Sequence, residues 1–174
     1  MADTKRPFMG KLLVLRGLPA CGKTTYARKF VENDPWGVRV SRDDYRFMMW
    51  DGKFSRLKED TVVSCMQANV KHLLRQGFNV VLDNTHLDPA HLKIAKDCVA
   101  LGFAMSTKYY EVKDFYEDAE VCIERNAERP EQFQVPDYVI RDMARRWKWP
   151  PKPPEANPLK KDNGGVRGDP IIKM

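Results

Sequence analysis

The sequence predicts one α/β domain, built on a doubly wound, mainly parallel sheet of about four strands with helices on both faces. Two observations predict it. Short apolar runs at 11–15, 38–40, 78–83 and 103–112 alternate with longer segments of helical spacing. The 174 residues, 43 % of them hydrophobic, suit a single domain with its own core. Strands that alternate with helices favour parallel pairing.

Breakers and caps set the expected boundaries of the elements. Gly77 ends a long stretch whose apolar residues recur at the helical period. Asp88 is a typical N-cap, and Pro89 suits the first position of a helix. In chain order we expect a strand at 11–15, a helix at 23–33, a strand at 38–40, helices at 43–50 and 55–76, a strand at 78–83, a helix at 88–101, a strand at 103–112, and helices at 116–129 and 136–147.

Residues 1–149 are expected to form the domain and 150–174 an extended tail, because the prolines after position 149 suit neither a helix nor a central strand. Residues 145–174 carry +5 of the net charge of +6. This basic end indicates an anionic partner, with nucleic acid as the obvious one, or else a solubilising tail. The four cysteines are widely spaced, and no apolar run approaches the ~20 residues of a membrane helix. We therefore expect a cytoplasmic protein without membrane association.

The strongest motif is the run 17–24, Gly-Leu-Pro-Ala-Cys-Gly-Lys-Thr, which fits G-x-x-x-x-G-K-[ST] between a predicted strand and a predicted helix. The backbone N–H groups of such a loop cradle phosphate oxygens. Lys23 would reach the β- and γ-phosphates of ATP, and the Thr24 hydroxyl would bind Mg²⁺. The motif predicts a P-loop NTPase fold with ATP and Mg²⁺ as cofactors. The expected nucleotide-binding residues in this stretch are Gly17, Gly22, Lys23, Thr24 and Thr25.

Two carboxylates follow predicted strands, at the sheet edge where ligands bind in doubly wound folds. Asp43, in the R-D-D-Y-R string at 42–46, can take the proton of an attacking hydroxyl; the alternative is a capping carboxylate. Asp83 ends an apolar strand, as does the second magnesium-associated carboxylate of P-loop enzymes. Either could hold Mg²⁺ through water, beside Thr24. His86 is open to two readings, a base or a loop residue.

Arg125 and Arg129 share one helical face just before Pro130. Mobile lids with arginines neutralise charge during phosphoryl transfer in many small kinases, so we expect a lid here. Solvated surface charge is the alternative interpretation.

Together these residues resemble the kinase domain of the bacteriophage 5′-polynucleotide kinase/phosphatase family. The resemblance covers most of 11–147 and rests on the P-loop, R-D-D-Y-R, the D-[NT]-x-x-L-[DN]-P string at 83–89 and R-N-x-x-R at 125–129. It implies an ATP-dependent kinase that phosphorylates 5′-hydroxyl ends of DNA or RNA, in the host cytoplasm if a phage encodes it. No D-x-D-x-T phosphatase motif occurs, so a separate phosphatase is expected to complete end repair.

The resemblance also implies roles for the matched positions. Asp43 would be the general base, and Lys23 and Arg129 would serve the ATP phosphates, assisted by Arg125. Asp83 would support the acceptor site, and one way to do so is to orient Arg46. The implied acceptor-binding residues are Arg42, Arg46, Asp83 and Thr85, and the resemblance implies that Arg46 binds a substrate phosphate near the hydroxyl.

Other acceptors fit the same chemistry. They include 5-hydroxymethyluracil in phage DNA and small metabolites. A nucleotide-dependent switch is a different class, and the absence of an N-K-x-D guanine motif disfavours a GTPase of that kind. The preference between DNA and RNA and the oligomeric state, a homo-oligomer included, stay open at this point.

Overall fold

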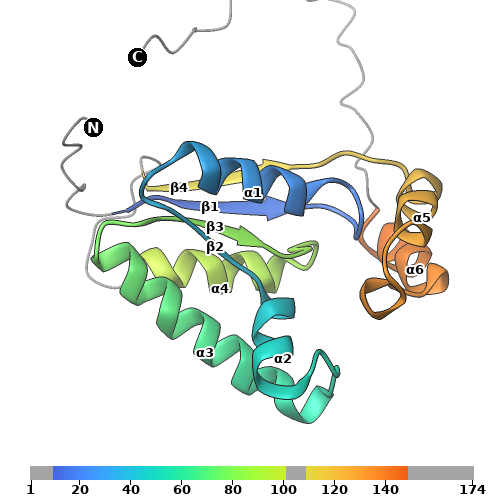
Figure 1. Cartoon of the computed structure of the whole chain (residues 1–174), viewed down its shortest axis with the longest axis horizontal. Helices are drawn as coiled ribbons and strands as arrows, with labels where there is room; N and C mark the ends of the chain where they lie inside the picture. The colour runs from blue at the N-terminus through green and yellow to red at the C-terminus, as the bar shows by residue number, and fades with distance from the viewer. Residues whose placement is uncertain (1–9, 101–108, 149–174) are drawn as a thin grey trace, which may run out of the picture.

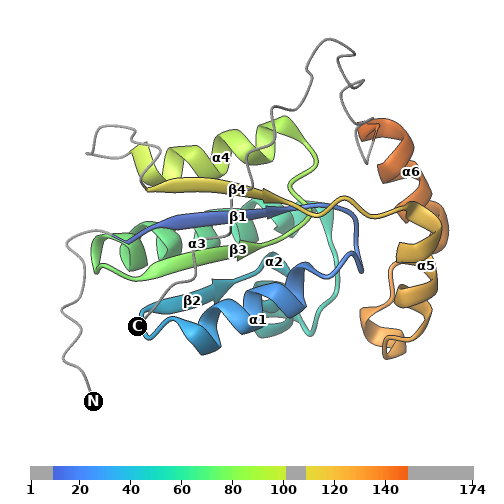
Figure 2. The same ribbon diagram turned by 90° about the horizontal axis from the view of Figure 1, so that it is seen from above.

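The computed structural model describes residues 10–100 and 109–148, and its centre is one sheet of four parallel strands in the order β2-β3-β1-β4 (Figures 1 and 2). Leu15 of the first strand lies in register with Asp83 of the third, so the carboxyl ends of these two strands meet at one edge. The strands are β1 (Leu12–Arg16), β2 (Gly37–Val40), β3 (Asn79–Asp83) and β4 (Tyr110–Asp114).

Helices cover both faces of the sheet, with α1 (Lys23–Asn33) on one side and α3 (Arg56–Arg75) and α4 (Pro89–Ala100) on the other (Figure 1). Successive side chains of β1 point to opposite faces of the sheet, so both faces need a covering layer. Leu12 and Val14 belong to the core under α3 and α4, whereas Leu13 and Leu15 pack with residues of α1. A strand buried on both faces needs a continuous apolar run. The predicted α/β P-loop NTPase fold is confirmed.

The remaining helices lie near the carboxyl ends of the strands, toward the lower and right-hand parts of Figure 1. The helix α2 (Arg42–Trp50) follows β2 and packs against α3. A pair formed by α5 (Ala119–Ala127) and α6 (Asp137–Trp147), joined through the short 3-10 helix η1 (Glu131–Phe133), packs on the P-loop through a core that contains Leu18, Cys21, Cys122 and Ile140.

The larger differences from the predicted boundaries are in α5 and β4, and the other boundaries agree within one residue. The helix expected from residue 116 begins at Ala119, because the side chain of Asp118 caps it by accepting the N–H of Glu120 at 2.8 Å. The last strand runs to Asp114, and residues 103–108 of its predicted range lie outside the described part of the chain. Residues 150–174 lie outside it too, so the domain boundary stays a prediction. Within 10–100 and 109–148, no helix has the length and apolar character to span a membrane.

Candidate active site

The P-loop connects β1 to α1 in a tight turn. A Cβ at Gly17 would lie 2.7 Å from Cys21 Sγ and 2.8 Å from the carbonyl oxygen of Phe115, so only glycine fits without a shift. Gly22 adopts φ +97, and the space on the side where a Cβ would stand is open. The N–H of Gly17 donates to the carbonyl of Thr85 at 3.0 Å, which ties the loop to the end of β3.

Lys23 is buried, with 7 % of the residue exposed, although it carries a charge. Its Nζ donates to the backbone carbonyls of Gly17 (3.1 Å) and Leu18 (2.5 Å) and contacts Cys21 Sγ at 3.3 Å. No carboxylate of the described residues lies within 4.0 Å of this ammonium group. A buried cation with only neutral partners is a strong anion site, and the P-loop opens onto it.

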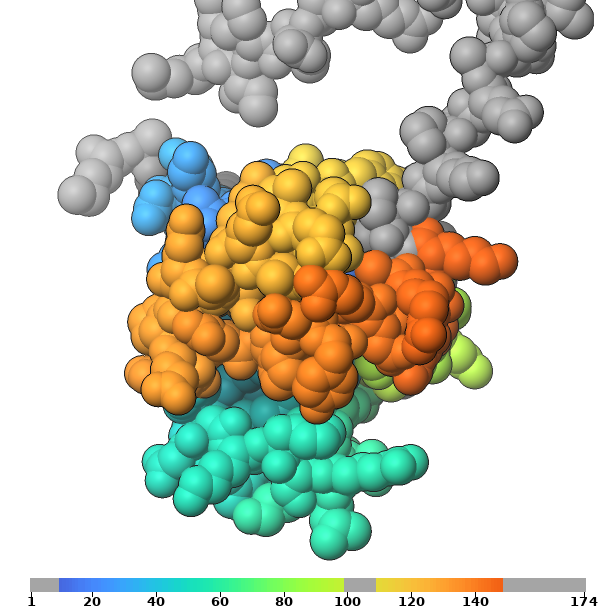
Figure 3. Space-filling view, turned by 90° about the vertical axis from the view of Figure 1, so that its right-hand side faces the viewer, coloured from blue at the N-terminus to red at the C-terminus, as the bar shows by residue number. Residues whose placement is uncertain are grey.

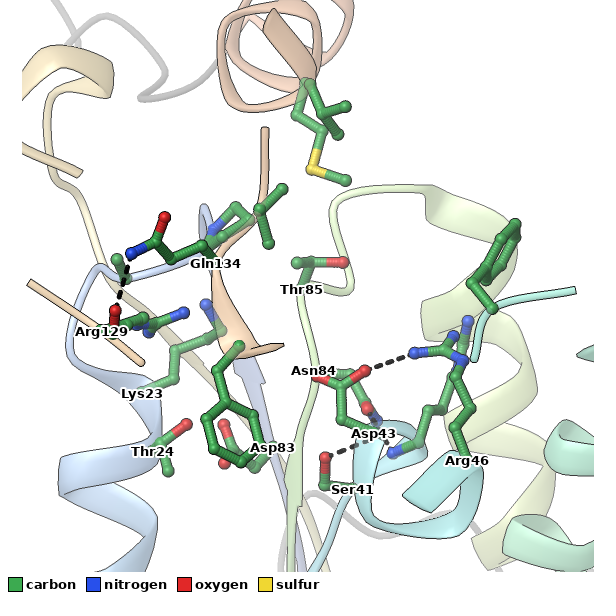
Figure 4. Close-up of a pocket in the computed structure, with 18 of the residues that line it drawn as sticks. Lys23, Thr24, Ser41, Asp43, Arg46, Asp83, Asn84, Thr85, Arg129 and Gln134 are labelled. Atoms are coloured by element: carbon green, nitrogen blue, oxygen red, sulfur yellow. Dashed lines mark hydrogen bonds and ion pairs between the residues drawn. The ribbon is translucent and has the colours of Figure 1, made fainter. Parts of the chain in front are cut away.

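Two clefts meet at the P-loop, and Ala20, Thr24 and Arg129 line both. The first, here called the main cleft, has a volume of about 650 Å³ and opens between α2 and the α5–α6 pair (Figures 3 and 4). The second, the side cleft, has about 550 Å³. Among the predicted site residues, the main cleft is lined by Lys23, Thr24, Arg42, Asp43, Arg46, Asp83, Thr85 and Arg129, and the side cleft by Gly22, Thr24, Thr25, Arg125 and Arg129.

Asp43 stands at the N-terminal turn of α2. Ser41 caps this helix by accepting the backbone N–H of Asp43 at 3.2 Å. The cap leaves the Asp43 side chain in the main cleft, 74 % exposed and in an ion pair with Arg46 (Figure 4). An accessible carboxylate in the cleft that also holds Lys23 can accept a proton from a bound hydroxyl.

Glu59 of α3 was not found by the sequence analysis, yet it holds Arg46 with both oxygens, at 3.0 Å to Nε and 2.5 Å to a terminal nitrogen. Burial alone would lower the pKa of Arg46, but the hydrogen bonds that Arg46 donates to Glu59 and the charge of Asp43 outweigh burial and raise this pKa. The contact depends on the packing of α2 against α3, for which the sequence holds no local signal.

Asp83 is almost fully enclosed, with 3 % of its side chain exposed, and pairs with Arg39 Nε at 2.7 Å. Arg39 comes from β2, the neighbouring strand, and also pairs with Asp44. The partner of Asp83 in the structure is thus Arg39, a residue that the sequence analysis missed, and not Arg46.

His86 lies outside the main cleft, fully buried, and its Nδ1 is 2.8 Å from the carbonyl oxygen of Leu15. Burial, together with the charges of Arg42 and Lys23, lowers the pKa of His86 to about 4 despite this hydrogen bond. The ring is therefore neutral near pH 7. Of the two readings left open, the geometry supports the loop residue.

Arg129 lines both clefts from a turn that is held by the buried side chain of Asn126. The amide of Asn126 donates to the carbonyl of Val135 at 2.8 Å and accepts the Val135 N–H at 3.1 Å. Gln134 donates to the carbonyl of Arg129 at 2.7 Å (Figure 4). Arg125, half exposed, pairs with Glu117 at 2.7 Å. The hydrogen bonds place the 129–135 turn beside the P-loop with Arg129 in both clefts.

The oxygen donors in the main cleft suit Mg²⁺ bound partly through substrate phosphates better than a metal ion held by protein side chains alone. Within the described segments, no three His, Cys, Asp or Glu side chains gather to bind a metal ion. The oxygen donors predicted for Mg²⁺, the Thr24 hydroxyl and the carboxylates of Asp43 and Asp83, all line the main cleft. Mg²⁺ prefers oxygen ligands, keeps several waters and usually binds through substrate phosphates with one or two protein groups, which fits this set.

A P-loop lysine, a carboxylate and arginines in one cleft of this fold are typical of a P-loop kinase domain. The family model described as an AAA domain matches residues 12–150, so the chain belongs to that family. In the computed structure it is similar to a chain of the Pnkp1/Rnl/Hen1 RNA repair complex, with 29 % identity and a TM-score of 0.64, over 85 % of this chain and 47 % of that one.

Two further likenesses are more limited. Human NEDD4-binding protein 2 is 32 % identical over 91 residues, which are 51 % of this chain and 5 % of that protein. The APS kinase of Mycobacterium tuberculosis shares 19 % identity with a TM-score of 0.54, over 70 % of this chain and 71 % of the other, which shows the fold alone. This chain thus spans less than half the length of the first relatives that it matches.

Proposed function

We propose that the protein transfers the γ-phosphate of ATP to the 5′-hydroxyl end of DNA or RNA. The observation that carries this proposal is that Asp43 and Arg46 line the same cleft as Lys23 and Arg129, from the opposite wall (Figure 4). A donor phosphate and an acceptor hydroxyl could therefore meet inside one volume of about 650 Å³.

The donor half is assigned to the P-loop and the turn beside it. The uncompensated charge of Lys23 suits the β- and γ-phosphates, and Arg129, between the two clefts, suits the charge that develops on the transferring group. Thr24, with Asp83 or Asp43 through water, would hold Mg²⁺, which supplies charge neutralisation on these phosphates when bound. The side cleft, with Thr25 and Arg125, is assigned to the rest of the nucleotide.

The acceptor half is assigned to the start of α2. Asp43 would accept the proton of the 5′-hydroxyl as its oxygen forms a bond to the γ-phosphorus and the bond from that phosphorus to the ADP oxygen breaks. Arg42 and Arg46 line the wall where a phosphate next to that hydroxyl would lie, with Asp83 and Thr85 at the end of β3. Arginine suits such a phosphate because its planar donors match phosphate oxygens in pairs.

The relative in the RNA repair complex supports a nucleic-acid acceptor, because its identity of 29 % extends over 85 % of this chain. The test offers labelled ATP and Mg²⁺ to the protein with 5′-hydroxyl DNA and RNA oligonucleotides, a hydroxymethyluracil duplex and free nucleosides in parallel. We expect label on the oligonucleotide ends. Label on the duplex bases or the nucleosides alone would replace the proposal with another acceptor.

Two variants sharpen this assay. Asp43→Asn should lose about 10²- to 10⁴-fold in turnover through loss of the base. Asp60→Asn is the matched control, because Asp60 is an exposed carboxylate of α3 that lines neither cleft. Equal activity of the two variants would remove Asp43 from the mechanism.

A further inference from the structure

The helix α6 presents three different faces. Ile140 is fully buried in the core shared with the P-loop, and Ala144 and Trp147 pack against that core. Val139 and Met143, four residues apart, line the main cleft. The third face points to solvent, and the arginines on it belong neither to the core nor to the lining of the two clefts.

This outward face combines one aromatic ring with two cations. Tyr138 is 74 % exposed, and the side chains of Arg145 and Arg146 are 84 % and 64 % exposed. The two arginines follow Tyr138 by about two turns of the helix, so the three side chains share one side of α6. Exposed rings beside exposed cations are typical of surfaces that bind single-stranded nucleic acid, because the ring stacks on a base and the cations contact the backbone.

The outward face is continuous with the main cleft. Tyr138 belongs to both, since it also lines the cleft in which Lys23 and Asp43 lie. Figure 3 shows α6, in orange, across this cleft from α2. Arg145 and Arg146 lie about 10 Å farther along the helix axis than Tyr138, which equals the rise of about three stacked nucleotides. A strand whose end lies in the cleft can therefore reach these arginines a few nucleotides from that end.

The two arginines are accessible to a further anion. Both donate at 2.8 Å to one carboxylate, that of Asp142, so two cations share a single negative charge. Ion pairs this exposed are weak, because water screens them, and a phosphate can join or replace the carboxylate at little cost. The positive charge also continues in the sequence, since residues 145–174 carry +5.

We propose that the outward face of α6 binds the single-stranded backbone of a nucleic-acid acceptor beyond its first few nucleotides, with Tyr138 stacked on a base and Arg145 and Arg146 on phosphates. The proposal rests on the proposed function for the direction of the strand, whose 5′ end lies in the main cleft. It makes α6 the element that senses acceptor length: a strand long enough to leave the cleft gains affinity from the arginines, and a dinucleotide does not.

The test compares the double variant Arg145→Gln/Arg146→Gln with a matched control, Arg28→Gln/Arg75→Gln, which removes two exposed arginines of α1 and α3 that line neither cleft. Fluorescence anisotropy without ATP measures the binding of a 5′-hydroxyl single strand labelled at its 3′ end. At about 0.7 for each phosphate contact, the α6 double variant should flatten the slope of log K against log salt by about 1.4 for a strand of about 12 nucleotides. The control should keep the parent's slope, and the affinity of a dinucleotide, measured by competition, should not fall in either variant.

The ring is tested separately. Tyr138→Ala should weaken binding of the long strand by about 5-fold or more at every salt concentration without a change of slope, whereas Tyr138→Phe keeps the ring and should bind as the parent does. Normal binding by Tyr138→Ala would overturn the stacking role. Melting curves check that each variant is folded.

An unchanged salt slope in the α6 double variant, or an equal change in the control, would overturn the inference. If the α6 double variant loses affinity for the long strand but no 5′-hydroxyl end is phosphorylated, the binding surface stands and the proposed acceptor is wrong. If ends are phosphorylated and the α6 double variant binds long strands as the parent does, the inference is wrong and the proposed function stands.

Discussion

The pair between Arg39 and Asp83 makes a quantitative prediction about stability. Arg39→Met keeps most of the side-chain volume but removes the charge that faces a carboxylate of which 3 % is exposed. The variant therefore leaves the Asp83 carboxylate enclosed without its cation. We expect Arg39→Met to be among the most destabilising substitutions at the edge of the main cleft.

The magnitude follows from the burial of the two partners. Removing one member of a buried pair costs about 3–5 kcal/mol, and since Arg39 itself is 21 % exposed we take the lower end, about 3 kcal/mol. For a chain of this size, each kcal/mol lowers Tm by roughly 2–4 °C, so the expected shift is roughly 6–12 °C. The double variant with Asp83→Asn should lose less than the sum of the single variants, because no enclosed carboxylate is left without its cation and Asp44, the other partner of Arg39, is more than half exposed.

The assay is urea and thermal unfolding of the single and double variants beside a control. Arg141→Met is that control. Arg141 forms two hydrogen bonds with the carboxylate of Glu120, and both side chains are more than half exposed. Exposed pairs contribute about 0–1 kcal/mol, so the control should lose little. If Arg39→Met lost no more stability than Arg141→Met, the argument from burial would be refuted.

Three further predictions concern the reaction and the loops around it. Lys23→Ala should abolish transfer and weaken ATP in calorimetry, whereas Asp43→Ala should abolish transfer and keep most ATP affinity; a near-normal turnover of the latter would exclude the base role. Asn126→Ala should destabilise the protein by about 1–3 kcal/mol and lower kcat, because Val135 loses the two hydrogen bonds that hold the 129–135 turn. Unchanged proteolysis at 130–136 would contradict this prediction. The low pKa of His86, about 4 against 6.5, means that the unfolded chain binds the proton more tightly, so this group's stabilisation is complete above pH 6.5 and falls by roughly 3 kcal/mol as the pH drops to 4. His86→Asn should flatten the loss of unfolding free energy over this range in pH-dependent urea titrations, and an equal slope would count against the buried neutral ring.

Much of the fold was predictable because its signals are local. Lys11 to Leu15 reads as a buried central strand, and the structure places β1 between β3 and β4 with both faces covered. The P-loop is a contiguous motif whose chemistry is set by its own backbone. The start of α5 was placed too early, because the cap that decides it is the side chain of Asp118 and helical spacing alone does not locate a cap.

The sequence also predicted the chemical groups of the candidate site. The P-loop, Asp43 and Asp83 lie at or just after carboxyl ends of parallel strands, which converge, whereas Arg129 was predicted from the motif at the end of a helix. Lys23, Asp43, Asp83 and Arg129 do line one cleft. The sequence did not show which side chains these residues pair with in the fold. Asn126 was quoted only as a letter in a motif, and its role in placing Val135 became visible with the fold.

The sequence by itself therefore determined the class of fold, the phosphate loop and the list of polar residues at the sheet edge. Only the tertiary structure decided which charges are neutralised. Arg39 meets Asp83 across 44 positions of sequence and Arg46 meets Glu59 across 13. Arg42 is left buried with one donor unpaired. The physical reason is that Coulomb energy and desolvation depend on distance and burial in space, and those follow from the strand order β2-β3-β1-β4 and the packing of α2 on α3, which no local pattern encodes.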